Sequence, residues 1–442
     1  MSHNQFYLPD ILSALDIDAL NEMQQASLDA TAHHDNVMII SATGSGKTLA
    51  FLLPVIRSVV PALRTTQAII IVPSRELALQ IEDVFKKMRT GLKVSCCYGG
   101  HKREIEENNL REVPAVIIGT PGRLGDHIRR GNIKTDAIHT LVLDEFDKSL
   151  EMGFTEEVSF VVGSLKSVQK RILTSATEAA EIPAFIGAAD FTKLNFGSDE
   201  PVSEEILSIK KVLSPEIDKI ETLFKLLCYI GDRSSIIFCN HRDAVERVSA
   251  MLADKGITNT FYHGALEQPE RETAMAKFRN GSINFLVTTD LAARGLDVPN
   301  IRYVIHYHLP GTEEIFTHRN GRTARMDASG TVILIINDKE QLPSYIQQTV
   351  EEISLESTYP LPEKPKWATL HISAGKKDKV NKIDIVGFLS NKGQLKKEDI
   401  GLIDVKDFFS FVAVRRTKAS HVLQLVKDQK IKNKKVKIVV AK

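Results

Sequence analysis

The hydrophobic and polar positions alternate in blocks through the first 340 residues of the chain. Short apolar runs, each bounded by turn residues, are separated by polar or amphipathic stretches long enough for a helix. The runs lie at residues 37–40, 68–72, 115–118, 141–143, 171–173, 235–238, 284–287, 303–305 and 332–335. Continuous apolar strands of this length are typical of parallel sheets with helices on both faces. A polar stretch at 197–201 interrupts the series, so the pattern predicts two α/β domains in tandem.

A different pattern follows the proline-rich stretch 359–365, which suits neither a helix nor a central strand. Beyond it we expect strands near 369–372, 400–405, 408–414 and 436–440, with helices near 379–388 and 417–429. This β-α-β-β-α-β order indicates a small ferredoxin-like α+β domain. The expected division is a first domain at 1–200, a second at 201–358, a linker at 359–366 and a third domain at 367–442.

The composition is that of a globular protein, with 442 residues, 43% of them hydrophobic and 26% charged. No apolar run reaches the 18 residues of a membrane-spanning helix, and the start lacks the basic and apolar segments of an export signal. The four cysteines show no C-x-x-C spacing and suit a reducing compartment. We therefore expect a cytoplasmic protein that acts as a monomer, away from membranes.

Charge is distributed unevenly along the chain. Residues 363–442 hold 20 Lys and Arg against 8 Asp and Glu, a net charge of +12, whereas the remainder carries −11. A basic module on an acidic body is typical of a polyanion-binding appendage, because phosphate contacts release counterions. A solvated basic surface without a partner is the alternative.

A glycine-rich loop, residues 41–48, follows the first apolar run and precedes a helical pattern. Such a loop turns backbone N–H groups toward a triphosphate, while Lys47 adds a positive charge and the Thr48 hydroxyl can bind Mg²⁺. Ser41 stands where the first glycine of this loop is usual, and a chance glycine-rich turn is the alternative.

Two further segments supply the chemistry that a bound triphosphate needs. Asp144 and Glu145 end an apolar run, where the first can hold Mg²⁺ and the second can orient and deprotonate a water molecule. Residues 318–325 contain three arginines in the second domain, which can stabilise charge on the γ-phosphate. Read alone, the acidic segment would be a solvated turn and the arginines surface groups.

Together these segments resemble the DEAD-box RNA helicases of superfamily 2, and the resemblance covers both α/β domains in the family's order. The resembling positions are Gln24 and residues 41–48, 73–78, 99–100, 120–123, 144–147, 175–177, 236–240, 263–271, 288–297 and 318–325. The resemblance implies two RecA-like domains and an enzyme that hydrolyses ATP, with Mg²⁺, in response to RNA.

The resemblance also implies a role for each matching position. Gln24 would select adenine and Asp297 would contact the ribose, while the phosphates would lie on Thr43, Gly44, Ser45, Gly46, Lys47 and Thr48. Thr48 and Asp144 would bind Mg²⁺, and catalysis would use Lys47, Asp144, Glu145, Arg322 and Arg325. Coupling of hydrolysis to unwinding would involve Asp147, Ser175 and Thr177.

One RNA strand would be held by its phosphates and sugars, without reading its sequence. The residues implied are Arg75, Gly100, Thr120, Arg123, Arg271 and Thr288. Single members have plainer interpretations, because Thr288 can be a strand-end hydroxyl and Arg123 or Arg271 a surface cation.

The chain departs from the family pattern at several positions. Phe146 replaces an alanine, so a bulky ring is expected beside the metal site, where it would alter turnover or the contacts of Ser175 and Thr177. Ala324 replaces a glycine and Asn320 an apolar residue, which would shift Arg325. The stretch before Gln24 lacks the usual Pro-Thr, leaving Phe6 or Tyr7 to stack on adenine.

The basic module resembles the C-terminal domain of the DbpA-type helicases at residues 369–372, 384–389, 400–403, 412–414 and 429–437. The resemblance implies an RRM-type domain that holds a hairpin of large-subunit ribosomal RNA. The basic residues expected to touch RNA are Arg415, Arg416, Lys418, Lys432, Lys434 and Lys435. Phe408, Phe409 and Phe411 are candidates for stacking on bases or, alternatively, core residues.

The leading hypothesis is an ATP-dependent RNA helicase that locally remodels structured RNA, with large-subunit ribosomal RNA during ribosome assembly as the expected target. An ATP-gated RNA clamp that unwinds nothing is the alternative. A DNA translocase with the same core is a third hypothesis, which the RNA-type motifs argue against.

Overall fold

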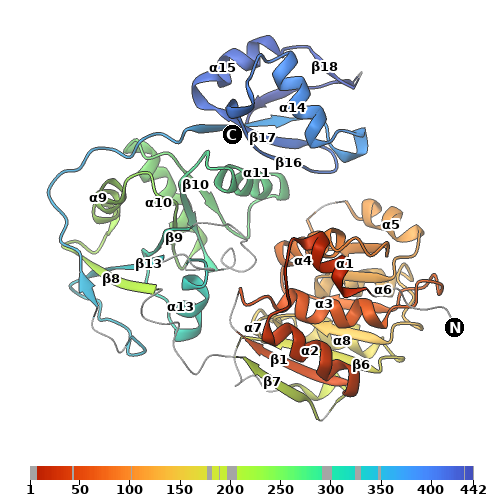
Figure 1. Cartoon of the computed structure of the whole chain (residues 1–442). Coiled ribbons are helices and arrows are strands. Elements are labelled where there is room, and N and C mark those ends of the chain that lie inside the picture. Colours follow the sequence, from red (N-terminus) through yellow and green to blue (C-terminus); the bar gives the residue numbers. More distant parts are fainter. Residues whose placement is uncertain are drawn as a thin grey trace. The chain divides into compact units, whose positions relative to one another are not determined.

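The computed structural model describes residues 7–41, 44–100, 102–176, 182–188, 190–196, 207–290, 301–323, 330–346, 350–432 and 434–441. The chain divides into two compact units, Met1–Val202 and Ser203–Lys442 (Figure 1). Each unit is described by itself. None of the helices in the described ranges has the length and apolar character needed to cross a membrane.

The first unit is built on a seven-stranded parallel sheet in the order β3-β4-β2-β5-β6-β1-β7. Its strands are β1 (Asn36–Ser41), β2 (Ala68–Ile71), β3 (Val94–Cys97), β4 (Val116–Gly119), β5 (Thr140–Leu143), β6 (Lys170–Ser175) and β7 (Thr192–Phe196). Its helices are α1 (Leu8–Leu15), α2 (Glu22–His33), α3 (Lys47–Ser58), α4 (Arg75–Lys87), α5 (Arg103–Arg111), α6 (Pro121–Arg129), α7 (Phe146–Glu151), α8 (Thr155–Gly163) and the 3-10 turn η1 (Ala184–Ile186).

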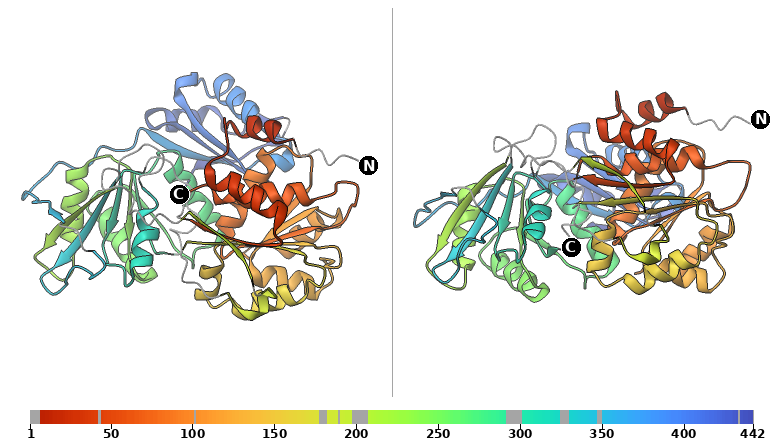
Figure 2. Two further views of the ribbon diagram at one scale, coloured as in Figure 1. Left: turned by 60° about the horizontal axis from the view of Figure 1, so that its bottom comes forward. Right: turned by 90° about the horizontal axis from the view of Figure 1, so that it is seen from below.

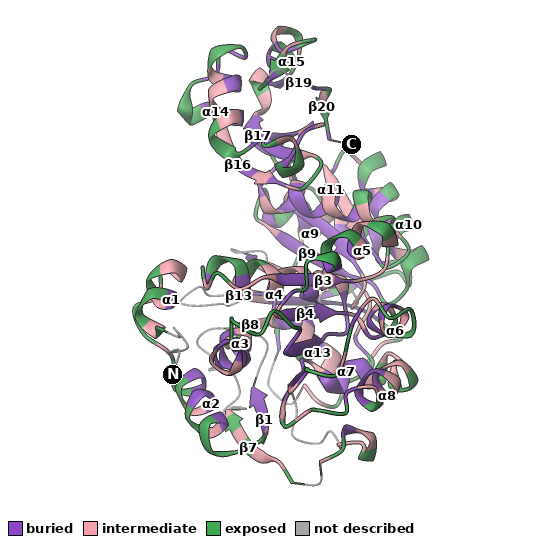
Figure 3. Cartoon of the chain, turned by 90° about the vertical axis from the view of Figure 1, so that its right-hand side faces the viewer, coloured by how far each residue is buried: buried purple, intermediate pink, exposed green. Residues whose placement is uncertain are grey.

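Successive residues of each central strand enter two separate apolar layers. In β1, Val37 and Ile39 pack in the layer that includes α3 and α4, whereas Met38 and Ile40 pack in the layer that includes α6 and α8. Because side chains alternate between the faces of a sheet, a strand covered on both faces must be apolar throughout. Figure 2 shows the helices on both faces, and Figure 3 shows the buried strands between them.

The second unit repeats this architecture with the order β10-β11-β9-β12-β13-β8-β14. Its parallel strands are β8 (Leu207–Ser214), β9 (Ser235–Phe238), β10 (Asn259–Tyr262), β11 (Phe285–Thr288), β12 (Tyr303–His306), β13 (Gly330–Asn337) and β14 (Glu351–Glu352). Its helices are α9 (Ile220–Ile230), α10 (Arg242–Asp254), α11 (Gln268–Arg279) and α13 (Glu313–Asn320). The predicted pair of parallel α/β domains is confirmed.

The strands that the apolar pattern missed lie mostly at the sheet edges. β3 and β7 are the two edges of the first sheet, and β10 and β14 are those of the second. β7 alternates between half-buried and exposed positions, and β10 is half-buried at three of its four positions. An edge strand needs no continuous apolar run, since one side of it faces solvent.

The second unit ends in a four-stranded antiparallel sheet with the order β16-β17-β15-β20. Its elements are β15 (Trp367–Ile372), η2 (Lys376–Asp378), α14 (Lys382–Asn391), η3 (Lys397–Asp399), β16 (Ile400–Val405), β17 (Ser410–Arg415), α15 (Arg416–Leu425) and β20 (Ile438–Val440). The predicted ferredoxin-like domain is confirmed. A short hairpin of β18 (Lys430–Ile431) and β19 (Lys434–Lys435) was not predicted.

One face of this antiparallel sheet packs on α14 and α15, and part of the other face contacts α11 and the turn after it. Phe411 is buried with Ala276 of α11. The Thr369 hydroxyl lies 2.9 Å from the Asn280 amide nitrogen and 2.9 Å from the Ser282 hydroxyl. This sheet face is therefore occupied by protein over part of its area.

Candidate functional site

The glycine-rich loop lies between the end of β1 and the start of α3, as predicted. Gly46 has φ +94°, and a Cβ atom there would lie 2.5 Å from the Gln24 amide nitrogen, so only glycine suits the position. The Lys47 ammonium is 9% exposed and donates to the Ser41 carbonyl oxygen. The Ser41 backbone therefore holds the lysine against the loop. Thr43 lies outside the described residues.

Gln24 is bonded directly to this loop. Asn21 caps α2, with its side chain accepting from the Gln24 backbone N–H at 2.9 Å while the side-chain Oε1 of Gln24 accepts from the Asn21 backbone N–H at 3.1 Å. The Gln24 amide donates to the Gly46 carbonyl at 3.2 Å, and the Asn21 amide donates to the Ser45 carbonyl at 2.9 Å. The N-cap of α2 thus joins Gln24, the residue expected to select adenine, to the glycine-rich loop. The part played by Asn21 was not anticipated from the sequence.

The carboxylate expected to bind Mg²⁺, Asp144, and the expected base, Glu145, follow β5. Asp144 is 3% exposed, and burial, with Glu145 next in importance, raises its pKa to about 7, against the opposing hydrogen bond from Thr174 and the charge of Lys47. A buried carboxylate of this kind is stabilised by a cation. Glu145 has φ +48°, and its N–H donates to the Thr174 hydroxyl at 3.0 Å.

Thr174 and Asp147 connect this segment to the end of β6. The Thr174 hydroxyl donates to Asp144, and the Ser175 hydroxyl donates to Asp147 at 3.0 Å. Thr174 was missed from the sequence, although it directly precedes the segment 175–177. Thr177 lies outside the described residues. Segment 144–147 is therefore bonded to the end of β6 at two points, Asp144 to Thr174 and Asp147 to Ser175.

Phe146 is accommodated by the core. Its ring is 2% exposed and packs in the apolar layer that contains Ile40 and Leu143. The ring that replaces the family's alanine is therefore buried in the apolar layer on one face of the sheet.

The residues expected to hold RNA in the first unit lie on neighbouring segments. Arg75 begins α4, and a Cβ atom on Gly100 would lie 1.9 Å from its guanidinium, so these two positions pack together. Thr120 caps α6, and its N–H donates to the Cys97 carbonyl at 3.0 Å. Arg123, in the first turn of α6, lies 3.4 Å from the carboxylate of Glu106.

In the second unit, two expected RNA contacts are bonded within the protein. Arg271 is 5% exposed and donates to the Leu266 carbonyl at 3.0 Å and to the Gly264 carbonyl. The Thr288 hydroxyl is buried and donates to the Tyr262 carbonyl at 2.8 Å. Both side chains therefore shape the loop after β10.

The arginine-rich segment 318–325 is described as far as Thr323, so Ala324 and Arg325 lie outside the described residues. Asp297, in another segment, lies outside them as well. Arg322 is 4% exposed. Arg319, one of the three arginines offered for the γ-phosphate, is 1% exposed and bonds both carboxylate oxygens of Asp290 and the Asn240 side chain. It ties together the ends of β9, β11 and β12.

Asn320 is explained by its partner. Its amide oxygen lies 2.9 Å from Nε2 of His306, which is fully buried. Burial, and then the charge of Arg319, lower the pKa of His306 to about 3. A polar residue at position 320 satisfies a buried neutral histidine that an apolar residue would leave unpaired.

The basic residues of the C-terminal domain differ in their surroundings. Arg416 donates to the carbonyls of Pro365 and Ser282, and Arg415 lies over the Trp367 ring at 4.7 Å. The lysines are exposed and paired with aspartates: Lys418 with Asp399, Lys432 with Asp384, Lys434 with Asp378 and Lys435 with Asp428. Each lysine lowers the pKa of its aspartate partner.

The aromatic candidates are divided between core and surface. Phe411 is buried, whereas Phe408 is 54% exposed and Phe409 stacks on His371 with ring centroids 5.2 Å apart. A base could stack on Phe408 without displacing protein.

Comparison with known families gives three matches along the chain. Residues 21–184 match the DEAD/DEAH box helicase family, 218–327 the helicase conserved C-terminal domain and 369–440 the DbpA RNA binding domain. The chain is 32% identical to the ATP-dependent RNA helicase DbpA of Escherichia coli (strain K12), over 97% of this chain and 95% of that protein. It is 29% identical to the protein of the same name from Bacillus subtilis (strain 168), over 99% of each.

Solved structures give the same picture for the two parallel-sheet domains. S. cerevisiae Dbp5 bound to RNA and ADP BeF3 is similar with a TM-score of 0.66 and 28% identity, over 75% of this chain and 88% of that one. The DEAD-box helicase Mss116 bound to ssRNA and UDP-BeF is similar with a TM-score of 0.65 and 25% identity, over 74% and 72%.

Proposed function

This chain belongs to the DEAD-box ATP-dependent RNA helicases, in the DbpA group, and from that premise we propose that it remodels large-subunit ribosomal RNA during ribosome assembly. The observation that carries the proposal is the basic domain at 369–440, which matches the DbpA RNA binding domain and is attached to a helicase core that we expect to hold RNA by its backbone. Since backbone contacts carry no sequence information, target choice falls to this domain.

The exposed lysines of the C-terminal domain suit RNA binding. Lys432, Lys434 and Lys435 lie on or beside the hairpin β18–β19, and their side chains are 45%, 48% and 67% exposed. Exposed ion pairs are weak, so a phosphate can replace an aspartate as partner at small cost. The counterions released from RNA then favour binding.

The first unit holds the groups that would act on ATP. Lys47 would hold the β- and γ-phosphates, and Gln24 would receive the adenine while its amide remains linked to Gly46. The donor set of Thr48 and Asp144 fits Mg²⁺, since a hydroxyl and a buried carboxylate with a raised pKa are oxygen ligands that gain from a cation. When bound, the metal ion supplies positive charge at the γ-phosphate.

Glu145 would orient the attacking water molecule and accept its proton, from a backbone position fixed by Thr174. Arg322, of the second unit, would stabilise charge on the γ-phosphate. Since residues of both units would be needed, we expect hydrolysis to depend on RNA that engages both.

The test is steady-state ATPase activity of the full chain without RNA, with unrelated RNA and with a large-subunit ribosomal fragment containing the peptidyl-transferase region. The proposal expects strong stimulation by the ribosomal fragment alone, and displacement of a short strand annealed next to it. A variant with Lys432, Lys434 and Lys435 changed to Ala should lose the preference.

The matched control changes Lys86 and Lys87 to Ala, because these exposed lysines also pair with acidic residues, Glu82 and Asp83, on the first unit. Equal stimulation by every RNA would contradict a ribosomal target. Stimulation without strand displacement would favour an ATP-gated clamp.

A further inference from the structure

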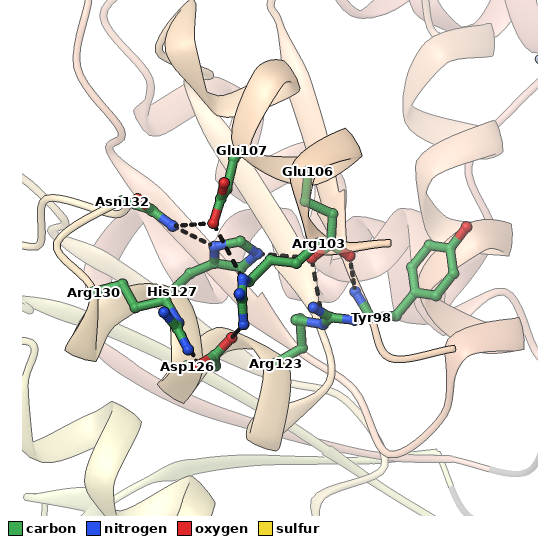
Figure 4. A network of polar contacts seen from close by, with 9 residues as sticks. All are labelled: Tyr98, Arg103, Glu106, Glu107, Arg123, Asp126, His127, Arg130 and Asn132. Carbon is green, nitrogen blue, oxygen red and sulfur yellow. Dashed lines mark hydrogen bonds and ion pairs between the residues drawn. The ribbon is translucent and has the colours of Figure 1, made fainter. Parts of the chain in front are cut away.

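A buried carboxylate with no role in ATP chemistry lies in the first unit beside the expected RNA-contacting segments. Glu106, on α5, is 1% exposed and lies at the centre of the polar network drawn in Figure 4. Burying a carboxylate is costly unless several partners bond it. The partners of Glu106 therefore indicate what its burial achieves.

Three groups bond Glu106, and they come from two different segments. Its Oε1 atom accepts from the Tyr98 N–H at 2.7 Å. Its Oε2 atom lies 2.7 Å from Nε2 of His127 and 3.4 Å from Nε of Arg123. Tyr98 directly precedes Gly99 and Gly100, whereas Arg123 and His127 lie on α6.

The backbone already places these segments side by side. Cys97, the last residue of β3, pairs with Gly119, the last residue of β4. The loop that leads to Gly100 and the turn at Thr120 thus leave adjacent strand ends. Glu106 adds a side-chain bridge, so a single carboxylate fixes both the loop and the first turn of α6.

Asn132 holds the His127 ring at its other nitrogen, Nδ1, and so orients Nε2 toward Glu106. Nδ1 of His127 lies 3.0 Å from the Asn132 amide nitrogen, which is a donor, and the ring is fully buried. Nδ1 therefore accepts, and Nε2 carries the hydrogen that is donated to Glu106. Glu107 and Arg103 surround the network closer to solvent.

A metal site is the other interpretation of this cluster, because ligand atoms of Cys97, Glu106 and His127 lie within 4.8 Å of one another. Two observations argue against it. The guanidinium of Arg123 occupies the vicinity of Glu106, where a cation would have to bind. Nε2 of His127 carries the hydrogen that is donated to Glu106, because Nδ1 accepts from Asn132, whereas a metal ligand needs a free lone pair on Nε2.

We propose that Glu106 is a positioning residue for RNA binding: it holds the loop at Gly100 and the side chain of Arg123 in the arrangement that grips the RNA backbone. The proposal rests on the proposed function, since it assumes that these segments contact RNA. Because the bridge is formed within the first unit, it is present before RNA arrives, which lowers the cost of ordering the site on binding.

The central test compares Glu106→Gln with wild type in an RNA titration of ATPase activity. The glutamine oxygen can still accept from the Tyr98 N–H, whereas its amide nitrogen is a donor that meets the donors of Arg123 and His127, so the charge and the bond opposite Arg123 are lost. The RNA concentration at half-maximal rate should rise about tenfold, the value for one charged hydrogen bond, while kcat changes less than about twofold. Glu106→Ala should raise the RNA concentration at half-maximal rate further.

Two controls separate positioning from general damage. Glu104→Gln removes the same charge from an exposed position of the same helix and should match wild type. Binding of a fluorescent ADP analogue should be unchanged in every variant, because Tyr98, Arg123 and His127, which bond Glu106, all lie outside residues 41–48. Thermal unfolding of each variant shows whether Glu106→Ala remains folded.

A double-mutant cycle tests the route through Arg123. In an Arg123→Ala background, Glu106→Gln should raise the RNA concentration at half-maximal rate by less than about twofold, since Arg123, the partner of Glu106, is already absent. Full additivity, or wild-type RNA dependence of Glu106→Gln, would overturn the inference. If wild type itself shows no response to RNA, the proposed function fails instead, so the two failures are distinguishable.

Discussion

Two charged side chains of the parallel-sheet domains, Glu106 and Arg319, are buried and bonded to several partners, whereas two lysines of the C-terminal hairpin β18–β19 pair singly on the surface. Glu106 and Arg319 are each 1% exposed and each bonds at least three groups. Lys434 and Lys435 are 48% and 67% exposed and pair with Asp378 and Asp428. Buried groups fix geometry, while exposed lysines remain available to exchange an aspartate for a phosphate.

The largest effect is expected in the ATP site. Glu145→Gln removes the expected base while leaving Asp144, Thr174 and Lys47 in place. Turnover in the presence of RNA should fall about a thousandfold, within the range for loss of a general base, while ATP and RNA still bind. Single-turnover hydrolysis and fluorescent-nucleotide binding check this, and retained turnover would remove Glu145 from its role.

Breaking a buried pair should cost stability, whereas breaking an exposed pair should not. Arg319→Ala leaves Asp290 and the Asn240 side chain without their partner, which should destabilise the second unit by about 3 kcal/mol or more. Urea unfolding followed by circular dichroism measures the loss. Lys435→Ala is the exposed control and should leave the urea concentration at the unfolding midpoint unchanged. Equal shifts of the midpoint in both variants would contradict the expected difference between buried and exposed pairs.

Salt should weaken RNA binding through the exposed lysines. Replacing Lys432, Lys434 and Lys435 with Ala removes three charges that can neutralise phosphates. The slope of the logarithm of RNA affinity against the logarithm of salt concentration should therefore become less steep by about 2. Fluorescence anisotropy with the ribosomal fragment measures this slope. An unchanged slope would assign RNA binding to other residues.

The smallest expected effect concerns the buried histidine of the second unit. His306 faces Arg319, Asn320 and the rings of Phe238 and Phe316, and its pKa is about 3 in the folded chain against an ordinary 6.5. Below pH 6.5 the unfolded chain takes up a proton that the folded chain does not, so stability should fall as the pH falls toward 3.

Between pH 7.5 and 5.5 the loss should be about 1.4 kcal/mol. Urea unfolding of wild type and His306→Gln at both pH values isolates this contribution, since the variant lacks the titrating group. His421→Gln removes an exposed histidine and should keep the wild-type pH dependence. The same pH dependence in His306→Gln would show that other groups cause it.

The central strands could be predicted because they are covered on both faces and must be apolar throughout, as in Ala68–Ile71. The edge strands could not, because half-exposed positions such as those of Thr192–Phe196 carry no distinctive pattern. The glycine-rich loop before α3 and Asp144 after β5 could be picked out as candidates, because binding a triphosphate and its metal ion requires particular residue types within a short span.

Thr174 and Glu106 were not found, since their partners lie 8 to 30 positions away along the chain. The bonds of Arg319 to Asp290 and Asn240, which are 29 and 79 positions away, were not found either.

The sequence by itself determined the two parallel-sheet folds and the ferredoxin-like fold, the place of the glycine-rich loop between β1 and α3 and the basic character of the C-terminal domain, because each depends on local pattern or on composition. The tertiary structure decided which charged residues are buried and what they bond: Arg271 holds the loop after β10, Asn320 satisfies His306, and Glu106 bridges the two expected RNA-contacting segments. Burial and partner choice arise only when distant segments pack, so no single segment of the sequence contains them.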